Sequence, residues 1–283
     1  MKNRSNKNQV VVAYTGPKSV LAKSFVKHYR NKFIFKSYTG DVRDYKSINL
    51  WLKKNTDINI FINFAAITSN KNCEKDKKKA LDVNYKSITK LLNLINKIPM
   101  KNFNYFLSIS SSHVFKKSNS KLSENSIKKP LNYYGITKLA LENYIFKNQN
   151  KFRFKIGIAR IFNYYNKGQK KGFFINDVIK RLKENKKIIK FNNVNAYRDF
   201  ISMKDINIAL FKMINLKLTN DYNICSGKKV FLPDIINHLS KIYKKKVLII
   251  NSKKSSMLIG SNAKLRKKGW KITNKKLFNE LYK

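Results

Sequence analysis

The feature that most constrains the fold is a regular alternation of strand-like and helix-like segments through the first 160 residues. Strand-like apolar runs occupy residues 9–14, 32–38, 58–65, 104–110 and 154–160, and helical periodicity occupies 19–30, 44–54, 74–97 and 131–148. Strands that alternate with helices form parallel sheets covered by helices on both faces. The pattern therefore predicts a doubly wound parallel α/β sheet.

The second half of the chain has a looser pattern. A helix is predicted at 173–185 and a short strand at 187–191. With 283 residues, the chain is long enough for one large domain and a smaller lobe. We expect the sheet domain over residues 1–165 and a smaller C-terminal lobe over 166–283. We also expect the segment 194–210 to cross back to the sheet domain.

The charge of the chain is extreme, with 62 lysines and arginines against 15 acidic residues and a formal net charge of +47. Such a charge is typical of nucleic-acid binding. The lysines, however, are spread along the whole chain and arginine is scarce. The chain is also rich in Lys, Asn, Ile, Phe and Tyr, whose codons are dominated by A and T, which favours a biased nucleotide composition as the origin of the charge. We therefore expect no nucleic-acid partner, although the positive surface should speed the approach of an anionic substrate.

No membrane span or metal site is expected from the sequence. The longest apolar stretch, at 58–67, is shorter than the roughly 18 to 20 residues that cross a bilayer. Cys73 and Cys225 are far apart and have no metal-ligand spacing. These features predict a cytoplasmic protein.

The turn after the first predicted strand, in "YTGPKSVLA", has the outline of a dinucleotide-binding G-x-x-G-x-x-G turn. Gly16 retains the first glycine, which makes the tight turn, and Ala22 is a common substitute for the third. Ser19 replaces the glycine that permits close approach to a pyrophosphate. Its side chain takes space that the pyrophosphate would use, although its hydroxyl could donate a hydrogen bond to the phosphate.

A second candidate motif is the pair Tyr134 and Lys138, which share one helix face four residues apart. An ammonium beside a phenol lowers the pKa of the phenol toward the neutral range, where it can exchange protons. The spacing alone is weak evidence, because Tyr14 and Lys18 share it. Upstream, however, the strand at 104–110 runs into "SSSHVF", which places hydroxyls at the carboxyl end of a strand, where such sheets bind ligands.

Ten short motifs are distributed along the chain, in this order: "TGPKSVLA", "GDVRD", "NFAA", "VNYKSITKLL", "ISSSHVF", "PLNYYGITKLALE", "ARIFN", "YRDFISMKDI", "YNICSGK" and "KKGWK". In order and spacing they resemble the extended short-chain dehydrogenase/reductases, specifically the NAD-dependent epimerase/dehydratase family that acts on nucleotide sugars. The resemblance extends from about residue 9 to residue 275. It implies a Rossmann-type sheet domain, a substrate-binding lobe, a nucleotide-sugar substrate, a homodimer and no membrane association.

The resemblance also implies roles for individual residues. Ser111, Tyr134 and Lys138 would be catalytic, with Tyr134 as the acid/base. The implied cofactor-binding residues are Tyr134 and Lys138 together with Gly16, Ser19, Ala22, Asp41, Val42, Asn63, Ala65, Ala66 and Asn84. Asp41 would lie near the adenine, and Asn84 would brace the site. The implied substrate-binding residues are Ser111, Ser112, Asn163 and Arg198, and the forked donors of the arginine suit a diphosphate.

The two residues after the implied catalytic hydroxyl reduce the number of reactions that the resemblance allows. Dehydratases of the family carry an Asp-Glu pair there, whereas this chain has Ser112 and His113. The epimerase-reductases of the fucose type carry a cysteine in this loop, which Ser112 does not match. The second half is most similar to the reductases of GDP-4-keto-6-deoxy-D-mannose, which belong to GDP-mannose metabolism. That similarity implies reduction of a 4-keto group, with Tyr134 protonating the oxygen.

Two alternatives remain open at this stage: a 4-epimerase of the UDP-galactose type, and a family member without catalysis that binds an anionic partner. The second predicted strand is followed by no acidic residue for a ribose 2′-hydroxyl, and Lys36 or Ser37 could tolerate a 2′-phosphate. We therefore expect NADP as the cofactor, with NAD as the alternative.

Overall fold

The structure is a computed structural model that describes residues 9–165, 173–250 and 255–273. The chain divides into two compact units. The first, called the sheet unit below, contains the described residues up to Val114 together with Pro130–Arg160 and Ala209–Asp221. The second unit contains Phe115–Lys129, the described parts of Ile161–Ile208, and the described residues from Tyr222 onward. The predicted second domain begins at residue 166, which lies outside the described residues.

A six-stranded sheet is the centre of the sheet unit, with the strand order β10-β5-β4-β3-β1-β2. Its strands are β1 Val11–Thr15, β2 Ile34–Tyr38, β3 Ile60–Asn63, β4 Tyr105–Ser111, β5 Lys155–Ile161 and β10 Asn220–Ile224. The pairs β1–β2, β1–β3 and β3–β4 are parallel. The prediction of a parallel sheet built from alternating elements is confirmed.

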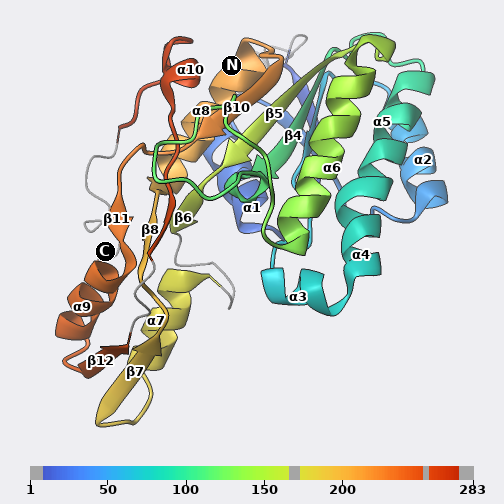
Figure 1. Ribbon diagram of the computed structural model, residues 1–283. Coiled ribbons are helices and arrows are strands. Elements are labelled where there is room, and N and C mark those ends of the chain that lie inside the picture. The colour runs from blue at the N-terminus through green and yellow to red at the C-terminus, as the bar shows by residue number, and fades with distance from the viewer. Residues whose placement is uncertain (1–8, 166–172, 251–254, 274–283) are drawn as a thin grey trace, which may run out of the picture. The chain divides into compact units, whose positions relative to one another are not determined.

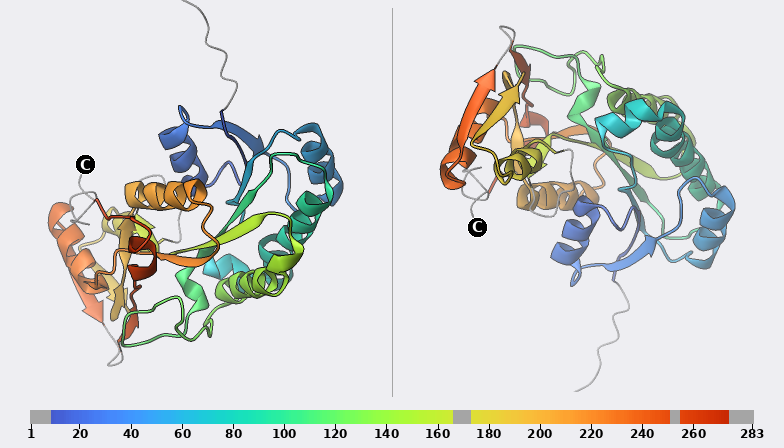
Figure 2. Two further views of the ribbon diagram at one scale, coloured as in Figure 1. Left: turned by 90° about the horizontal axis from the view of Figure 1, so that it is seen from above. Right: turned by 90° about the horizontal axis from the view of Figure 1, so that it is seen from below.

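Helices cover both faces of this sheet. On one face lie α2 Tyr45–Lys54, α5 Ser87–Lys97 and α6 Tyr133–Asn148 (Figure 1). On the other face lie α1 Val20–Tyr29 and the second half of α8 Met203–Asn215, as the views along the sheet show (Figure 2). Phe211 of α8 stacks on Tyr29 of α1 with ring centroids 4.6 Å apart.

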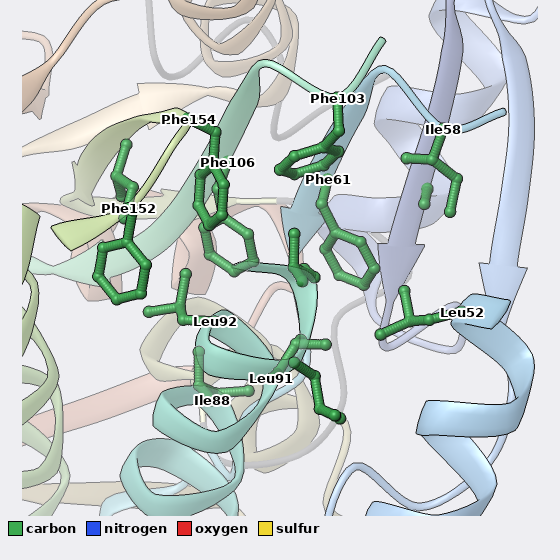
Figure 3. Close-up of a cluster of buried hydrophobic side chains, with 14 of the residues drawn as sticks. Leu52, Ile58, Phe61, Ile88, Leu91, Leu92, Phe103, Phe106, Phe152 and Phe154 are labelled. Carbon is green, nitrogen blue, oxygen red and sulfur yellow. The ribbon is translucent and has the colours of Figure 1, made fainter. Parts of the chain in front are cut away.

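The core between the sheet and α5 is aromatic on the strand side and aliphatic on the helix side (Figure 3). Phe61 of β3 and Phe106 of β4 are fully buried and stack with centroids 5.6 Å apart. Leu91 and Leu92 of α5 belong to the same buried cluster. Burying each such side chain contributes about 1.5–3 kcal/mol, so this layer fixes the strands whose ends carry the candidate site.

The helix predicted at 74–97 is divided into four pieces, and in this respect the prediction is wrong. The pieces are α3 Asn70–Lys75, α4 Lys77–Leu81, the π-helical turn η1 Asp82–Lys86 and α5. The break has a local cause, because the Asp76 side chain accepts a hydrogen bond from the backbone N–H of Lys79 and starts a new helix. Asn84 lies in the π-helical turn η1, which continues α4 without a break.

The second unit contains three small sheets. β7 Ile188–Asn192 pairs with β12 Lys246–Ile250, and β6 Asn163–Tyr165 pairs with β9 Phe200–Ser202. β8 Ala196–Arg198 lies between β11 Val230–Phe231 and β13 Ser256–Leu258. Among the described residues, the helices of the second unit are α7 Phe174–Leu182, the first half of α8, α9 Leu232–Ile242 and α10 Ala263–Arg266. The predicted helix at 173–185 and strand at 187–191 correspond to α7 and β7.

A buried carboxylate organises the loops of the second unit. Asp199 accepts hydrogen bonds from the backbone N–H and the hydroxyl of Ser226, and from the N–H groups of Gly227 and Gly260. Burial raises the pKa of Asp199, and the four donors act against that rise. Within the described parts of the chain, no helix has the length and apolar character needed to cross a membrane.

Candidate active site

The candidate site begins at the carboxyl edge of the parallel sheet. β1, β3 and β4 are neighbours and end at Thr15, Asn63 and Ser111. Because parallel strands end on the same edge, the turn after β1, the loop after β3 and the serines after β4 come together there. Three segments that the sequence singled out separately therefore border one region of the sheet unit.

The Gly16 turn touches the loop after β3 backbone to backbone. Gly16 has a φ of +67°, and a Cβ atom built on it would lie 2.8 Å from the Ala65 nitrogen. Both the positive φ and the close approach require glycine. The turn after β1 is therefore packed tightly on the loop after β3, and position 16 accepts no side chain.

Ser19 is the N-cap of α1. Its Oγ accepts a hydrogen bond from the backbone N–H of Ala22 at 3.1 Å, and its own N–H donates to the Gly16 carbonyl at 2.9 Å. Its φ of −72° needs no glycine. The serine therefore stabilises the helix start, and the hydroxyl that accepts from Ala22 keeps its own proton to donate.

Thr15 and Asn63 form a buried pair beside this turn. Thr15 Oγ1 donates to Asn63 Oδ1 at 2.6 Å and accepts from the Ala65 N–H at 3.3 Å. These bonds fix the Asn63 amide, whose Nδ2 is buried with no hydrogen-bond partner among the described residues. A buried amide donor without a partner is costly, so its orientation indicates a place for a ligand acceptor. The sequence reasoning included Asn63 but missed Thr15.

Ser111 and Ser112 lie where β4 passes into the short 3₁₀ helix η2 Ser112–Val114. Both serines are buried, and Ser111 Oγ accepts from the His113 backbone N–H at 3.3 Å. The bond leaves the Ser111 hydroxyl proton free to be donated to a substrate oxygen.

Tyr134 and Lys138 lie in the first turns of α6, as predicted from their spacing. The Lys138 Nζ is 5.9 Å from the centroid of the Tyr134 ring and donates to the Ile109 carbonyl of β4 at 2.9 Å. Lys138 is 2% exposed. Burial lowers the pKa of Lys138 to about 8, while the charges of Glu142 and Cys73 act in the opposite direction. A charged ammonium is thus held close to the phenol.

His113 joins Ser111 to Tyr134, which the sequence reasoning did not foresee. Its ring meets the Tyr134 ring edge to face, with centroids 5.6 Å apart. Asn132 Oδ1 accepts from the Gly135 N–H, so Asn132 Nδ2 is the donor in its 2.8 Å bond to His113 Nδ1. In this arrangement Nδ1 accepts and the ring proton is on Nε2.

Gly135 allows α6 to approach η2. A Cβ on Gly135 would overlap the carbonyl oxygen of His113 and come within 3.0 Å of the Pro130 side chain. The signal that could have identified it is the glycine inside the N-Y-Y-G segment that contains Tyr134. The glycine therefore sets how close Tyr134 comes to the end of β4.

Asn84 links the loop after β3 to α6. Its Oδ1 accepts from the Ile67 N–H at 2.8 Å, and its Nδ2 donates to the Ile67 carbonyl and to Thr137 Oγ1, both at 3.0 Å. Asn84 is almost fully buried. π-helical turns are frequent at functional sites, and this one places the bracing side chain beside the helix that carries Tyr134.

The loop after β2 carries Asp41 and Val42. Asp41 and Arg43 form an exposed bidentate pair with a shortest distance of 2.5 Å, and this hydrogen bonding lowers the pKa of Asp41. Val42 is buried. The pair therefore places a carboxylate and a guanidinium side by side in the loop that follows β2.

Lys36 does not face this region. Its Nζ lies 2.8 Å from both carboxylate oxygens of Asp57. Lys36 and Phe61 pair with the same residue of β1, and Asp57 is four residues before Phe61, toward the amino edge of the sheet. The suggestion that Lys36 accommodates a 2′-phosphate is therefore not supported.

Asn163 and Arg198 belong to the second unit. Asn163 Nδ2 donates to the Asp199 carbonyl at 3.3 Å, and the Arg198 guanidinium donates to the Tyr197 carbonyl and to Ser256. Burial lowers the pKa of Arg198. Their part in substrate binding stays a prediction.

The sheet unit is a Rossmann-type α/β fold, because it has the strand order β2-β1-β3-β4-β5 with parallel pairs β1–β2, β1–β3 and β3–β4, helices on both faces and the Gly16 turn after β1. Residues 4–225 match the model of the family described as "NAD dependent epimerase/dehydratase family". The chain belongs to that family, which confirms the family resemblance of the sequence motifs.

Two relatives of known activity are similar in sequence. The GDP-6-deoxy-D-mannose reductase of Pseudomonas aeruginosa is 25% identical over 214 residues, which cover 70% of this chain and 69% of the relative. The GDP-6-deoxy-D-talose 4-dehydrogenase of Aggregatibacter actinomycetemcomitans is 32% identical over 109 residues, 38% of this chain and 36% of the relative. The match therefore spans only about a third of the latter protein.

Solved structures agree on the fold. The protein RMD from Pseudomonas aeruginosa, complexed with NADPH, superposes with a TM-score of 0.82 at 21% identity over 93% of each chain. The UDP-glucose 4-epimerase of Thermus thermophilus, complexed with NAD, has a TM-score of 0.81 at 15% identity over 93% of this chain and 94% of that chain. At these identities the likeness shows the fold alone.

Proposed function

We propose that the chain is an NAD(P)-dependent nucleotide-sugar oxidoreductase. The observation that carries this proposal is the buried Lys138 ammonium beside Tyr134, next to the strand that ends in Ser111. A lysine is seldom buried without a role, because desolvation penalises its charge. Here the charge supports a phenol that can give up or take a proton near neutral pH.

The sheet unit fits a nicotinamide dinucleotide. The Gly16 turn leaves no room for a Cβ beside Ala65, and the Asn63 Nδ2 has no partner among the described residues. The residues that would hold the cofactor are Gly16, Ser19, Ala22, Asp41, Val42, Asn63, Ala65, Ala66, Asn84, Tyr134 and Lys138. When bound, a nicotinamide cofactor exchanges hydride with a sugar carbon.

The side chains then have separate tasks in the reduction of a keto group. Tyr134 gives its proton to the keto oxygen as that oxygen gains charge. The Lys138 ammonium stabilises the phenolate that remains, and the Ser111 hydroxyl donates a hydrogen bond to the same oxygen. The keto carbon thus becomes a carbinol carbon, and Tyr134 recovers its proton from solvent.

We propose a GDP-4-keto-6-deoxy-hexose as the substrate. The similarity to the reductase of Pseudomonas aeruginosa over 70% of the chain supports this class of sugar. Ser112 and His113 supply no carboxyl pair for dehydration. Arg198 would bind the diphosphate through its forked donors. We propose NADP as the cofactor, with NAD as the alternative, since one structural neighbour contains NADPH and others contain NAD.

A 4-epimerase of the UDP-galactose type is the second candidate. It needs the same serine, tyrosine and lysine, and the similarity in fold to the UDP-glucose 4-epimerase of Thermus thermophilus favours it. The third candidate, a non-catalytic protein that binds an anionic partner, rests on the net charge of +47. The resemblance implies a homodimer and the sequence features favour the cytoplasm, which light scattering and fractionation would test.

The decisive experiment follows NADPH absorbance at 340 nm in the presence of a GDP-4-keto-6-deoxy-hexose. Oxidation is expected, and Tyr134→Phe should slow it by about 10²- to 10⁴-fold, since a general acid is lost. Tyr133→Phe is the matched control, because it removes the neighbouring hydroxyl and should change the rate little.

An unchanged rate in Tyr134→Phe would refute the assignment of the acid. Interconversion of UDP-glucose and UDP-galactose without net use of cofactor would favour the epimerase. Nucleic-acid affinity that falls steeply with salt, without turnover of any nucleotide sugar, would favour the non-catalytic protein.

A further inference from the structure

A buried cluster of charged side chains lies behind the candidate site, within the sheet unit. Arg160 of β5 is fully buried and contacts two carboxylates at once. Its guanidinium bonds both oxygens of Glu142 of α6, at 2.6 Å for Nη2 to Oε2 and 3.0 Å for Nε to Oε1. Its Nη1 lies 2.5 Å from Asp221 Oδ2 of β10.

Ser110 of β4 completes the cluster by donating from Oγ to Glu142 Oε1 at 2.5 Å. The Glu142 side chain is 2% exposed and that of Arg160 is 0% exposed. The carboxylate of Glu142 therefore has both oxygens occupied and no access to bulk water. Such an arrangement fixes the position of a negative charge.

The charges of this cluster do not cancel by themselves. One guanidinium faces two carboxylates, which leaves one excess negative charge in a buried place. The ammonium of Lys138 is the buried cation on the same helix, one turn before Glu142 and on the same face. With Lys138 included, two positive and two negative charges balance.

The strand opposite α6 brings the two charges into register. Lys138 donates to the carbonyl of Ile109, and Glu142 accepts from the hydroxyl of Ser110, the next residue of β4. Ser111 follows directly. The helix carrying Tyr134 is thus fastened to the strand carrying Ser111 by one positive and one negative group.

Among the described residues, no other group that faces Lys138 supplies the balancing charge. α6 presents Tyr134 and Glu142, α3 presents Cys73, and β4 presents the neutral Ile109 carbonyl. Burial raises the pKa of the Cys73 thiol, so it stays neutral around pH 7. The phenol of Tyr134 must itself be protonated to act as an acid.

We propose that Glu142 is a positioning residue that supplies the negative charge which keeps the buried Lys138 ammonium charged beside Tyr134. Arg160 and Ser110 hold the Glu142 carboxylate, and Asp221 balances the guanidinium. The inference rests on the proposed function in so far as Lys138 serves Tyr134, but the charge balance itself does not depend on any substrate.

Charge rescue tests the proposal without activity. Glu142→Gln keeps the shape and removes the charge, and it should lower the unfolding temperature of the full chain by about 10 °C, as expected for a broken buried pair. Adding Lys138→Met removes the charge that was left without a partner, so the double variant should recover at least about half of that loss. Strictly additive losses would overturn the proposal.

Asp221→Asn is the matched control. It removes one negative charge from the same cluster, but from the carboxylate on β10 rather than the one on α6. It should destabilise the chain comparably, and Lys138→Met should rescue it clearly less than it rescues Glu142→Gln. Equal rescue of the two variants would contradict a specific role for Glu142. Even if Glu142→Gln fails to fold alone, folding of the double variant would support the proposal and its failure would overturn it.

The rate profile tests the link to Tyr134. In Glu142→Gln the high-pH limb of the turnover rate should move to lower pH by about one unit, because the ammonium loses its proton earlier. In Asp221→Asn the shift should be less than half as large. An unmoved limb in a folded, active Glu142→Gln variant would overturn the proposal. Absence of turnover in the wild-type chain would refute the proposed function instead and leave the charge rescue interpretable.

Discussion

The backbone of Gly16 packs directly against the backbone of Ala65, so that a methyl group on Gly16 would lie 2.8 Å from the Ala65 nitrogen. Gly16→Ala should cost about 3 kcal/mol in the free energy of unfolding, from the positive φ and from the overlap together. Urea denaturation would measure it. Gly227→Ala is the control, since Gly227 also has a positive φ but a Cβ there meets no atom closer than 3.6 Å. Equal costs at the two positions would show that the Gly16 contact is not tight.

Ser19 tests whether the departure from the glycine pattern weakens the cofactor site. Ser19→Ala should cost about 1 kcal/mol of stability and Ser19→Gly only a few tenths, because serine and glycine are both good N-caps. We expect Ser19→Gly to bind NADPH no more tightly than wild type, as measured by calorimetry, since the hydroxyl it loses can donate to a phosphate. Clearly tighter binding by Ser19→Gly would mean that the serine obstructs the pyrophosphate.

The pKa of Lys138 predicts a pH limit for the reaction. Burial lowers that pKa to about 8, so the side chain is charged below pH 8 and neutral above it. Turnover should therefore be present below pH 8 and fall as the pH rises through that value, which a rate profile from pH 6 to 10 would show. Lys138→Arg keeps its charge across the range, so any activity it retains should lack this limb. A limb that persists in the arginine variant would have to arise from another group.

The cofactor preference can be assigned by two substitutions in and after β2. Lys36→Ala should leave the ratio of NADPH to NADH affinity within about twofold, because Lys36 is paired with Asp57 and directed toward the amino edge of the sheet. Arg43→Ala should shift the ratio toward NADH by about tenfold if the guanidinium meets a 2′-phosphate. Fluorescence titration would measure the NADPH and NADH affinities of both variants. A larger change in their ratio in Lys36→Ala than in Arg43→Ala would show that Lys36, and not Arg43, meets the 2′-phosphate.

Asp199 predicts a stability effect in the second unit. Each oxygen of Asp199 accepts two of its four hydrogen bonds, so Asp199→Asn, which replaces one oxygen by an NH₂ donor, loses up to two of them. The expected cost is about 2–4 kcal/mol, since buried donors would be left without partners. Chemical denaturation of the full chain measures this cost. Asp57→Asn, at an exposed ion pair, should cost less than about 1 kcal/mol and serves as the comparison.

Five of the six strands of the central sheet could be predicted within a few residues, because each is an apolar run long enough to be recognised alone, as at 34–38 and 105–111. The sixth, β10 Asn220–Ile224, was not predicted, because its segment "NDYNI" is largely polar. The division of the predicted 74–97 helix could not, because the capping of a new helix by Asp76 competes with a helical periodicity that continues across it. Periodicity in the sequence predicts where a helix can form. It does not predict where a single polar side chain ends one helix and begins the next.

In the candidate site, the spacing of Tyr134 and Lys138 and the serines at the end of β4 were visible in the sequence. The Asn132–His113 bond and the close approach of Gly135 to the His113 carbonyl were not, although the glycine itself is visible in the N-Y-Y-G segment. The ion pair of Lys36 with Asp57, which lies away from the site, was not visible either. Each depends on residues that are distant in sequence and meet only when strands and helices are in register. Contacts of this kind produce no regular spacing of residue types, so a single sequence gives no sign of them.

The contact between Gly135 and the His113 carbonyl has a consequence for how this chain could acquire new substrates. It packs the start of α6 directly against η2, which follows β4, so any side chain at position 135 would push apart the elements that carry the proposed proton-transfer groups. If Asn163 and Arg198 bind the substrate as proposed, selection for a different sugar would act on such residues outside that contact, while the contact itself is retained. An engineer seeking altered specificity should randomise the residues proposed to bind the substrate, Asn163 and Arg198 among them, and leave Gly135 untouched.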